Sequence, residues 1–218
     1  MKKSILFLLC ICCLPFLSAQ TSGVRLELPT EMVRNFQMGN NKLPSNVKGS
    51  PYLNKTFMPG VATIKDQSYT AILRYNAYSD EIEMKDEDNK NISLLKRDYI
   101  TASFDGNNYE IINLGNKKGY VIVLEKGHYS LFKRYIKEFI PEKEGATSYN
   151  SGKPAQLIDN ISYYIKIGDA SAKQVKFRKN DLMNLLGEKE VKSYAKMNKS
   201  KLNSESEVIN FIKKLNTK

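Results

Sequence analysis

The sequence has few of the side chains on which most catalytic and metal sites depend. It contains one histidine, three cysteines and no tryptophan among 218 residues. The cysteines, Cys10, Cys12 and Cys13, lie near the N-terminus, and the histidine is His128. A hydrolase triad or a histidine-rich metal site therefore lacks components. We interpret His128 as a surface residue and expect no catalytic residue, no metal site, no cofactor and no enzymatic activity.

The sequence has a single long apolar run, at the N-terminus, and this run has the form of an export signal. Residues 1–3 are cationic, residues 4–17 are almost entirely apolar, and small residues precede Gln20. This run of about 14 residues is shorter than the ~20 that a membrane-spanning helix needs. We predict a signal peptide over residues 1–19, cleaved at or next to Ala19, with no integral membrane segment after cleavage.

All three cysteines fall inside this predicted signal, in the middle of the apolar run. A lipid-anchored cysteine would instead follow small residues at the end of the run, so no lipid anchor is expected. The mature chain is then free of cysteine, and its stability must come from a hydrophobic core rather than from disulfides. We expect a secreted or periplasmic protein, with the cell surface as a further possible location.

The mature chain is basic. Residues 20–218 contain 32 Lys and Arg against 23 Asp and Glu, a net charge of about +9. Such an excess favours anionic partners, which here means an unknown envelope protein or an anionic surface glycan. The lysines are scattered, however, and no segment combines clustered arginine with aromatics as nucleic-acid grooves do. We interpret the excess as a solvated basic surface and expect no nucleic-acid binding.

Alternation of apolar and polar residues predicts an antiparallel β domain over residues 61–178. It is clearest in residues 69–78, where every second residue is apolar and these residues fall on one face of the strand. Further short strands follow at intervals of about 8–12 residues. The longer segment at residues 129–140 is compatible with a strand or a helix, and we favour a strand because it begins just after Gly127 and is rich in aromatic residues and Ile. Residues 20–60 are expected to be irregular, with a strand at 24–28, a helical turn within 30–36 and a loop at 40–59. The pattern is typical of a meander curled into a sandwich or an open barrel.

Helical periodicity replaces this alternation after Lys179, and three short helices are expected over residues 179–218. Ser204 and Glu207 have the spacing of a capping box at the start of the third helix. An apolar stripe follows it: Val208, Phe211, Ile212 and Leu215. Helices of this length are not stable alone in water, so we expect them to pack on the β domain. The predicted fold class is α+β.

One group of polar and aromatic residues is a candidate binding site. Arg74 and Asn76 lie on the face of the 69–78 strand opposite the apolar set. The other members are Glu81 and Glu83, after the next turn, and Tyr52 and Phe57, in the preceding loop. Two interpretations remain open: a cross-strand Arg–Glu pair with a turn-capping Asn, or a binding patch.

Two acidic groups have ordinary interpretations. Glu81 and Glu83 are interpreted as a solvated strand face rather than as paired acid/base carboxylates. Residues 86–91 offer oxygen ligands, but Asn91 and Arg97 occupy the positions where an EF-hand loop has glycine and glutamate. We interpret residues 86–91 as a polar hairpin turn.

Several spaced motifs occur in order between residues 49 and 216. They are Gly49-Ser50-Pro51-Tyr52-Leu53-Asn54, Phe57, Gly60, Leu73-Arg74-Tyr75-Asn76, Asp80-Glu81-Ile82-Glu83 and the Lys-rich helical segment 179–215. In these features the chain resembles an uncharacterised group of secreted proteins of Bacteroidota. The resemblance implies a periplasmic or surface location in a Gram-negative envelope and implies no activity.

Two functions are compatible with these features. The first is a non-enzymatic interaction module that contacts another envelope component. The alternative is a periplasmic carrier that holds an apolar ligand, such as a lipid, between the sheet and the helices. A filled interior favours the module, and a continuous apolar cavity of roughly several hundred Å³ favours the carrier.

Overall fold

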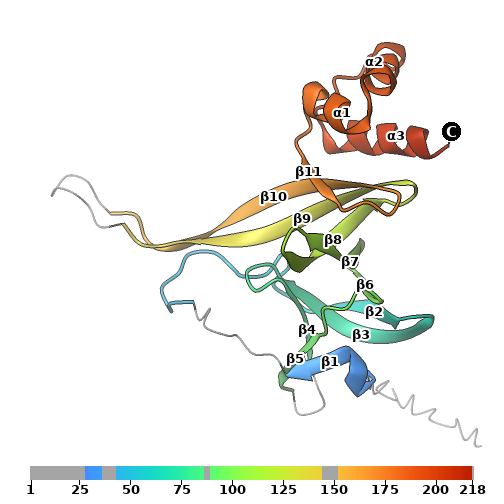
Figure 1. Ribbon diagram of the computed structural model, residues 1–218. Helices are drawn as coiled ribbons and strands as arrows, with labels where there is room; N and C mark the ends of the chain where they lie inside the picture. The colour runs from blue at the N-terminus through green and yellow to red at the C-terminus, as the bar shows by residue number, and fades with distance from the viewer. Residues whose placement is uncertain (1–27, 36–42, 86–88, 144–151, 218) are drawn as a thin grey trace, which may run out of the picture.

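A single antiparallel sheet followed by three helices makes up the described part of the chain (Figure 1). The computed structural model describes residues 28–35, 43–85, 89–143 and 152–217, so the predicted signal peptide and the strand at 24–28, except for Leu28, lie outside it. The strands are β1 (Val33–Asn35), β2 (Met58–Ile64), β3 (Gln67–Asn76), β4 (Glu81–Lys85), β5 (Asn91–Leu94), β6 (Ile100–Phe104), β7 (Asn107–Leu114), β8 (Lys117–Glu125), β9 (Tyr129–Ile140), β10 (Gln156–Ile167) and β11 (Lys173–Val175). The helices are α1 (Lys179–Leu186), α2 (Glu188–Met197) and α3 (Glu205–Asn216). The predicted α+β class, a meander followed by three C-terminal helices, is confirmed.

The eleven strands are ordered β1-β5-β4-β3-β2-β6-β7-β8-β9-β10-β11. Most strands pair with the next strand in sequence. Two pairings are not sequential: β1 pairs with β5, and β2 pairs with β6 as well as with β3, which places β3, β4 and β5 on its other side. The predicted helical turn at 30–36 is a single 3-10 turn, Thr30–Met32, which leads into β1. No helix in the described ranges is long and apolar enough to cross a membrane.

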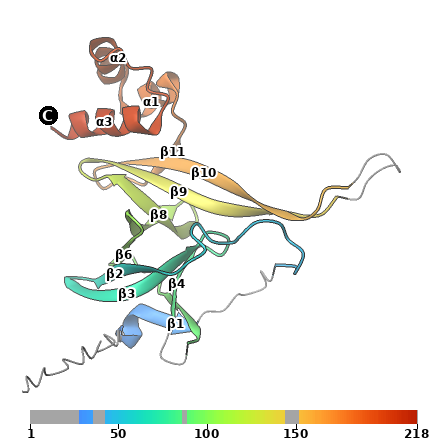
Figure 2. The same ribbon diagram turned by 180° about the vertical axis from the view of Figure 1, so that it is seen from behind.

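The sheet curls so that its apolar face packs against itself. The alternation predicted for β3 is confirmed, since Ala71 and Leu73 are fully buried whereas Ile72 between them is 42% exposed. The turn after β3 reaches across to β9, where the backbone N–H of Lys137 donates to the carbonyl oxygen of Ala77 at 2.9 Å. Strands far apart in the sheet order therefore meet along one side of the molecule (Figure 2).

Aromatic rings fill the centre of this curled sheet. The Tyr109 ring stacks on Phe104 with a centroid distance of 4.6 Å and lies 5.3 Å from the ring of Tyr75. Tyr120 meets Tyr75 edge-on at 6.2 Å. Stacked and edge-on pairs of this kind add to the stabilisation from burial alone. The rings come from β3, β6, β7 and β8, so they join strands that lie on opposite sides of β2 in the sheet order.

A segment before β2 forms a strap across the curl. At one end, the backbone of Lys48 forms two hydrogen bonds at the start of β10: its N–H donates to the carbonyl oxygen of Ala155, and its carbonyl oxygen accepts from the N–H of Leu157. At the other end, the N–H of Leu53 donates to the carbonyl oxygen of Tyr75 at 3.1 Å. Residues 48–53 therefore join β10 to the end of β3.

The three helices cover the β9–β11 end of the sheet and form a second core with it (Figure 1). The predicted stripe of α3 is buried: Val208, Phe211, Ile212 and Leu215. It shares this core with Leu131, Ile165 and Val175 from the sheet. The side chain of Asn216 fixes the end of α3, since it accepts from the N–H of Tyr129 at 2.8 Å and donates to the same residue's carbonyl oxygen at 2.9 Å.

The capping box that begins α3 is present as predicted. The Ser204 hydroxyl accepts from the N–H of Glu207, and the Glu207 carboxylate accepts from the N–H of Ser204. The same carboxylate accepts from the hydroxyl of Ser200 at 2.8 Å. Hydrogen bonds from Ser200, the Asn203 backbone and neighbouring donors lower the pKa of Glu207 to about 2.

Replacing Phe211 by alanine tests how firmly the helices are attached to the sheet. Phe211 is 1% exposed and packs against the ring of Tyr194. We expect the F211A variant to lose about 3–5 kcal/mol of unfolding free energy, measured by urea denaturation. The exposed neighbour Asn210 supplies a control, because N210A should change stability by no more than about 0.5 kcal/mol. An F211A variant as stable as wild type would mean that the helices detach from the sheet.

The lowered pKa of Glu207 predicts an acid-sensitive contribution to stability. Between its ordinary value of 4.5 and about 2, the folded protein keeps this carboxylate ionised while the unfolded chain binds a proton. Unfolded chains then bind more protons, so stability falls as the pH falls through this range. The stability difference between wild type and E207Q should be fully present above pH 5 and absent near pH 2, in urea denaturation at several pH values. The same change at exposed Glu142 is the control, and a difference that stays constant with pH would contradict the prediction.

Candidate functional site

The structure brings five of the six candidate residues together. Arg74 pairs with Glu83 directly across β3 and β4, with 2.7 Å between Nη2 and Oε2. The guanidinium carbon of Arg74 lies 3.5 Å from the ring centre of Tyr52 and 4.1 Å from that of Phe57. The fifth member, Asn76, donates to Glu83 Oε1 at 2.7 Å. We call these five residues the Arg74 cluster.

Asn76 also caps the turn between β3 and β4. Its side-chain oxygen accepts from the N–H groups of Tyr78 and Ser79 at 3.2 and 3.1 Å. Both parts of the structural interpretation, the cross-strand Arg–Glu pair and the turn-capping Asn, are therefore present. Binding by the Arg74 cluster stays a prediction.

The interpretation of Glu81 and Glu83 as a solvated strand face is wrong. Glu83 is completely buried and Glu81 is 7% exposed. The residues preceding β2 cover this face, and Arg74 donates from Nη1 to the carbonyl oxygen of Lys55 at 3.1 Å. A buried carboxylate is tolerated here because Arg74 and Asn76 supply a charge and two hydrogen bonds. The sequence did not show this burial, since the covering segment has no strand or helix periodicity.

The Arg74 cluster is closed toward solvent and holds the strap against the sheet. The Arg74 side chain is only 12% exposed. Cation–π contacts with Tyr52 and Phe57, together with the bond to Lys55, join residues 52–57 to β3. Burial and the nearby Glu83 charge raise the pKa of Tyr52, so its hydroxyl is protonated at neutral pH. The cluster therefore stabilises the curl of the sheet.

Glu81 belongs to a second polar group, centred on Asp80. Lys96 contacts both carboxylates, at 3.3 Å from Asp80 and 3.4 Å from Glu81. Arg134 of β9 lies 3.8 Å from Asp80. The backbone N–H of Tyr120 in β8 donates to Asp80 at 3.2 Å. We call this group the Asp80 node.

The Asp80 node joins the turn between β3 and β4 to β8 and β9, which lie on the other side of β2 in the sheet order. The Tyr75 hydroxyl donates to Asp80 at 2.8 Å, and burial raises the pKa of Tyr75 well above its ordinary value. Gly119 allows the close approach, because a Cβ there would lie 3.0 Å from Asp80 Oδ2. The Asp80 node has no local sequence signal, since its residues come from four separate segments. Asp80 lies in the turn between β3 and β4 and has a φ of 56°.

The remaining sequence candidates lie apart from these groups. His128 is exposed, with its ring edge-on to that of Tyr129. Residues 86–88 of the acidic turn lie outside the described residues. Within the described ranges, no group of three or more His, Cys, Asp or Glu residues could hold a metal ion.

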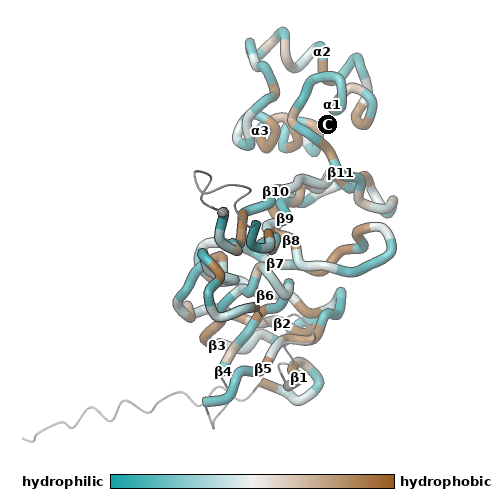
Figure 3. The backbone as a smooth tube through the Cα atoms, turned by 90° about the vertical axis from the view of Figure 1, so that its left-hand side faces the viewer, coloured by the Kyte–Doolittle hydropathy of each residue, from teal (hydrophilic) through white to brown (hydrophobic). Residues whose placement is uncertain are grey.

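The basic excess is concentrated at the C-terminal end rather than scattered. Residues 173–218 hold 12 of the 34 Lys and Arg residues but only 5 of the 23 Asp and Glu residues. Every one of these cations that the structure describes is exposed. Among the described residues, these cations form ion pairs only between Lys192 and Glu188 and between Lys213 and Glu125. Figure 3 shows hydrophilic residues along much of this helical layer.

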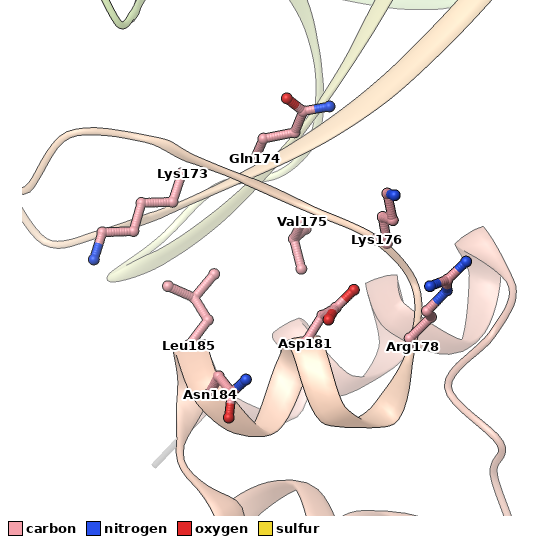
Figure 4. Close-up of a pocket in the computed structure, with 8 residues that line it drawn as sticks. All are labelled: Lys173, Gln174, Val175, Lys176, Arg178, Asp181, Asn184 and Leu185. Carbon is pink, nitrogen blue, oxygen red and sulfur yellow. The ribbon is translucent and has the colours of Figure 1, made fainter.

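A hollow of about 770 Å³ lies at this basic end, between β11 and α1 (Figure 4). The strand side is lined by residues 173–176, and the helix side includes Asp181 and Leu185. Val175 and Leu185 point toward the space between strand and helix in Figure 4. Three cations lie along its wall: Lys173, Lys176 and Arg178. The one sequence signal for this site is the group of four cations within residues 173–179.

The interior between the sheet and the helices is filled by side chains. Leu182, Val191 and Val208 of the helices are fully buried, as is Leu131 of β9. Three further hollows lined by described residues measure about 220, 290 and 260 Å³, and each has at least one charged residue in its lining. The large hollow beside β11 is open to solvent and has both polar and apolar walls.

Comparison with known proteins gives no match, since no protein-family model, curated protein or solved structure is significantly similar to this chain.

Replacing Arg74 tests whether the Arg74 cluster stabilises the fold through its buried charge pair. R74M leaves the Glu83 carboxylate buried beside Asn76 without its cation, and we expect a loss of about 3–5 kcal/mol of unfolding free energy. The double variant R74M/E83Q should recover much of this loss, because the amide of Gln accepts from Asn76 and carries no charge.

Urea denaturation measures both variants. The control is R97M, because Arg97 is exposed and forms no ion pair among the described residues; it should change stability by about 0.5 kcal/mol or less. An R74M variant as stable as R97M would show that the buried pair contributes little.

Proposed function

We propose that this protein is an exported, non-enzymatic interaction module of the bacterial envelope, which binds an anionic partner through its basic C-terminal layer. The observation that carries the proposal is the exposed excess of cations on β11 and the helices. Most of these cations have no carboxylate partner in the described part of the chain. Clustered unpaired charge of one sign attracts partners of the opposite sign and accelerates their association.

The carrier alternative has less support. A carrier needs a continuous apolar space for its ligand, whereas buried side chains occupy the region between the sheet and the helices. The prominent polar groups support the fold in the same way, because the Arg74 cluster and the Asp80 node both hold the curled sheet together. This leaves the outer surface as the functional part of the molecule.

Binding to isolated Gram-negative envelopes tests the proposal. We expect the chain beginning at Gln20 to sediment with the envelope fraction and to be released as salt rises from about 50 to 500 mM, because salt screens exposed charges. Neutralising Lys189, Lys196 and Lys199 to glutamine should reduce the retained fraction several-fold. The matched control neutralises three exposed lysines outside the C-terminal layer, Lys55, Lys117 and Lys153, and should retain most binding.

Three outcomes would contradict the proposal. The first is equal loss of envelope binding in both triple variants, and the second is no binding at low salt. The third is a stoichiometric lipid bound to the exported protein in native mass spectrometry, which would establish the carrier instead.

A further inference from the structure

The hollow beside β11 runs along the edge of the strand rather than over one of its faces. Successive side chains of a strand point to opposite faces. Lys173 and Val175 therefore lie on one face of β11, and Gln174 lies on the other. All three line the hollow, so the space must follow the strand's edge.

This edge has no strand beside it in the described part of the chain. β11 is the last strand of the sheet and pairs only with β10, through Tyr163–Ile165. The outward backbone N–H and C=O groups of such an edge are available to an added strand. Helix α1 forms the opposite wall, so the hollow is a groove between an edge strand and a helix (Figure 4).

The charges around the groove select among possible occupants. Lys173, Lys176 and Arg178 face a single carboxylate, that of Asp181. None of the four forms an ion pair with another described residue. A second copy of this chain would bring its own cationic edge strand and be repelled. An acidic strand would instead neutralise the excess.

We propose that the groove between β11 and α1 binds an extended acidic peptide segment of an envelope protein, which pairs with β11 as an additional strand. The inference depends on the proposed interaction function and specifies its partner. Main-chain hydrogen bonds to the edge provide the attachment, and alternate side chains provide specificity. Apolar side chains on one face of the peptide contact Val175 and Leu185, while carboxylates lie near Lys176 and Arg178.

A hexapeptide of alternating glutamate and valine, labelled with fluorescein, is the probe. It spans about 20 Å when extended, enough to cover β11 and both ends of the groove. Fluorescence anisotropy with the chain beginning at Gln20 should show saturable binding, and a peptide with lysine in place of glutamate should not bind. Replacing Lys173, Lys176 and Arg178 by glutamate should weaken binding at least tenfold.

The matched control replaces Lys55, Lys117 and Lys153 by glutamate. These three exposed lysines lie outside the C-terminal layer and do not line the groove. The change in net charge is the same, and the affinity should change less than twofold. All six side chains are exposed, so circular dichroism and melting temperature should match wild type for both triple variants.

N-methylated peptides test strand addition without altering the protein. Only alternate amides of an added strand face β11. Of two peptides methylated at odd or at even positions, one should therefore lose binding at least tenfold and the other should retain it. Equal affinity of the two methylated peptides, or equal weakening by the two triple variants, would overturn the proposal.

Other occupants give distinct results. Competition experiments use dextran sulfate, lipopolysaccharide and the unlabelled peptide. Binding of either glycan with no binding of the peptide would overturn the peptide proposal while leaving the interaction module in place. A dimer in sedimentation that is abolished by the Lys173, Lys176 and Arg178 changes would assign the groove to a second copy and overturn it as well. Absence of both peptide binding and envelope retention would refute both proposals.

Discussion

A single sheet of eleven strands must bury its apolar face, and it does so here by curling until β3 meets β9. Open sheets of this size rarely remain extended. The bond between Lys137 and Ala77, the Asp80 node and the strap at residues 48–53 all act at the place where the curl closes. Each joins segments distant in the sheet order. The aromatic core, the burial of Glu83 and the placement of the helices depend on this closure.

The polar residues that stand out in the sequence mainly serve this closure. The Glu83 carboxylate accepts one hydrogen bond from the Arg74 guanidinium and another from the Asn76 amide. The rings of Tyr52 and Phe57, which precede β2, pack against the same guanidinium. The residues left for a partner are less conspicuous: lysines of ordinary appearance on an edge strand and three helices. We therefore propose that the partner binds the surface on which most cations have no carboxylate partner within the described fold.

Local periodicity predicted the local structure well. Alternation identified β3, and a content rich in aromatic residues and Ile favoured a strand at β9. The spacing of Ser204, Glu207 and the α3 stripe identified that helix with its cap. Two features depend on tertiary contacts and had no local signal. β2 pairs with β6 across three intervening strands, and Glu83 is buried by a segment without periodicity. The groove beside β11 was missed for a similar reason, because it forms only when α1 folds back along the strand.

The position of α3 in the chain has a consequence for how the protein folds. Helix α3 follows β9, β10 and β11 in the chain, so it leaves the ribosome after them. Until it arrives, the apolar faces of Leu131, Ile165 and Val175 have nothing from α3 to cover them. Exposed apolar surface beside an unpaired strand edge is prone to aggregation. The interval between the synthesis of β11 and that of α3 is thus a period when a chaperone would protect this end of the sheet.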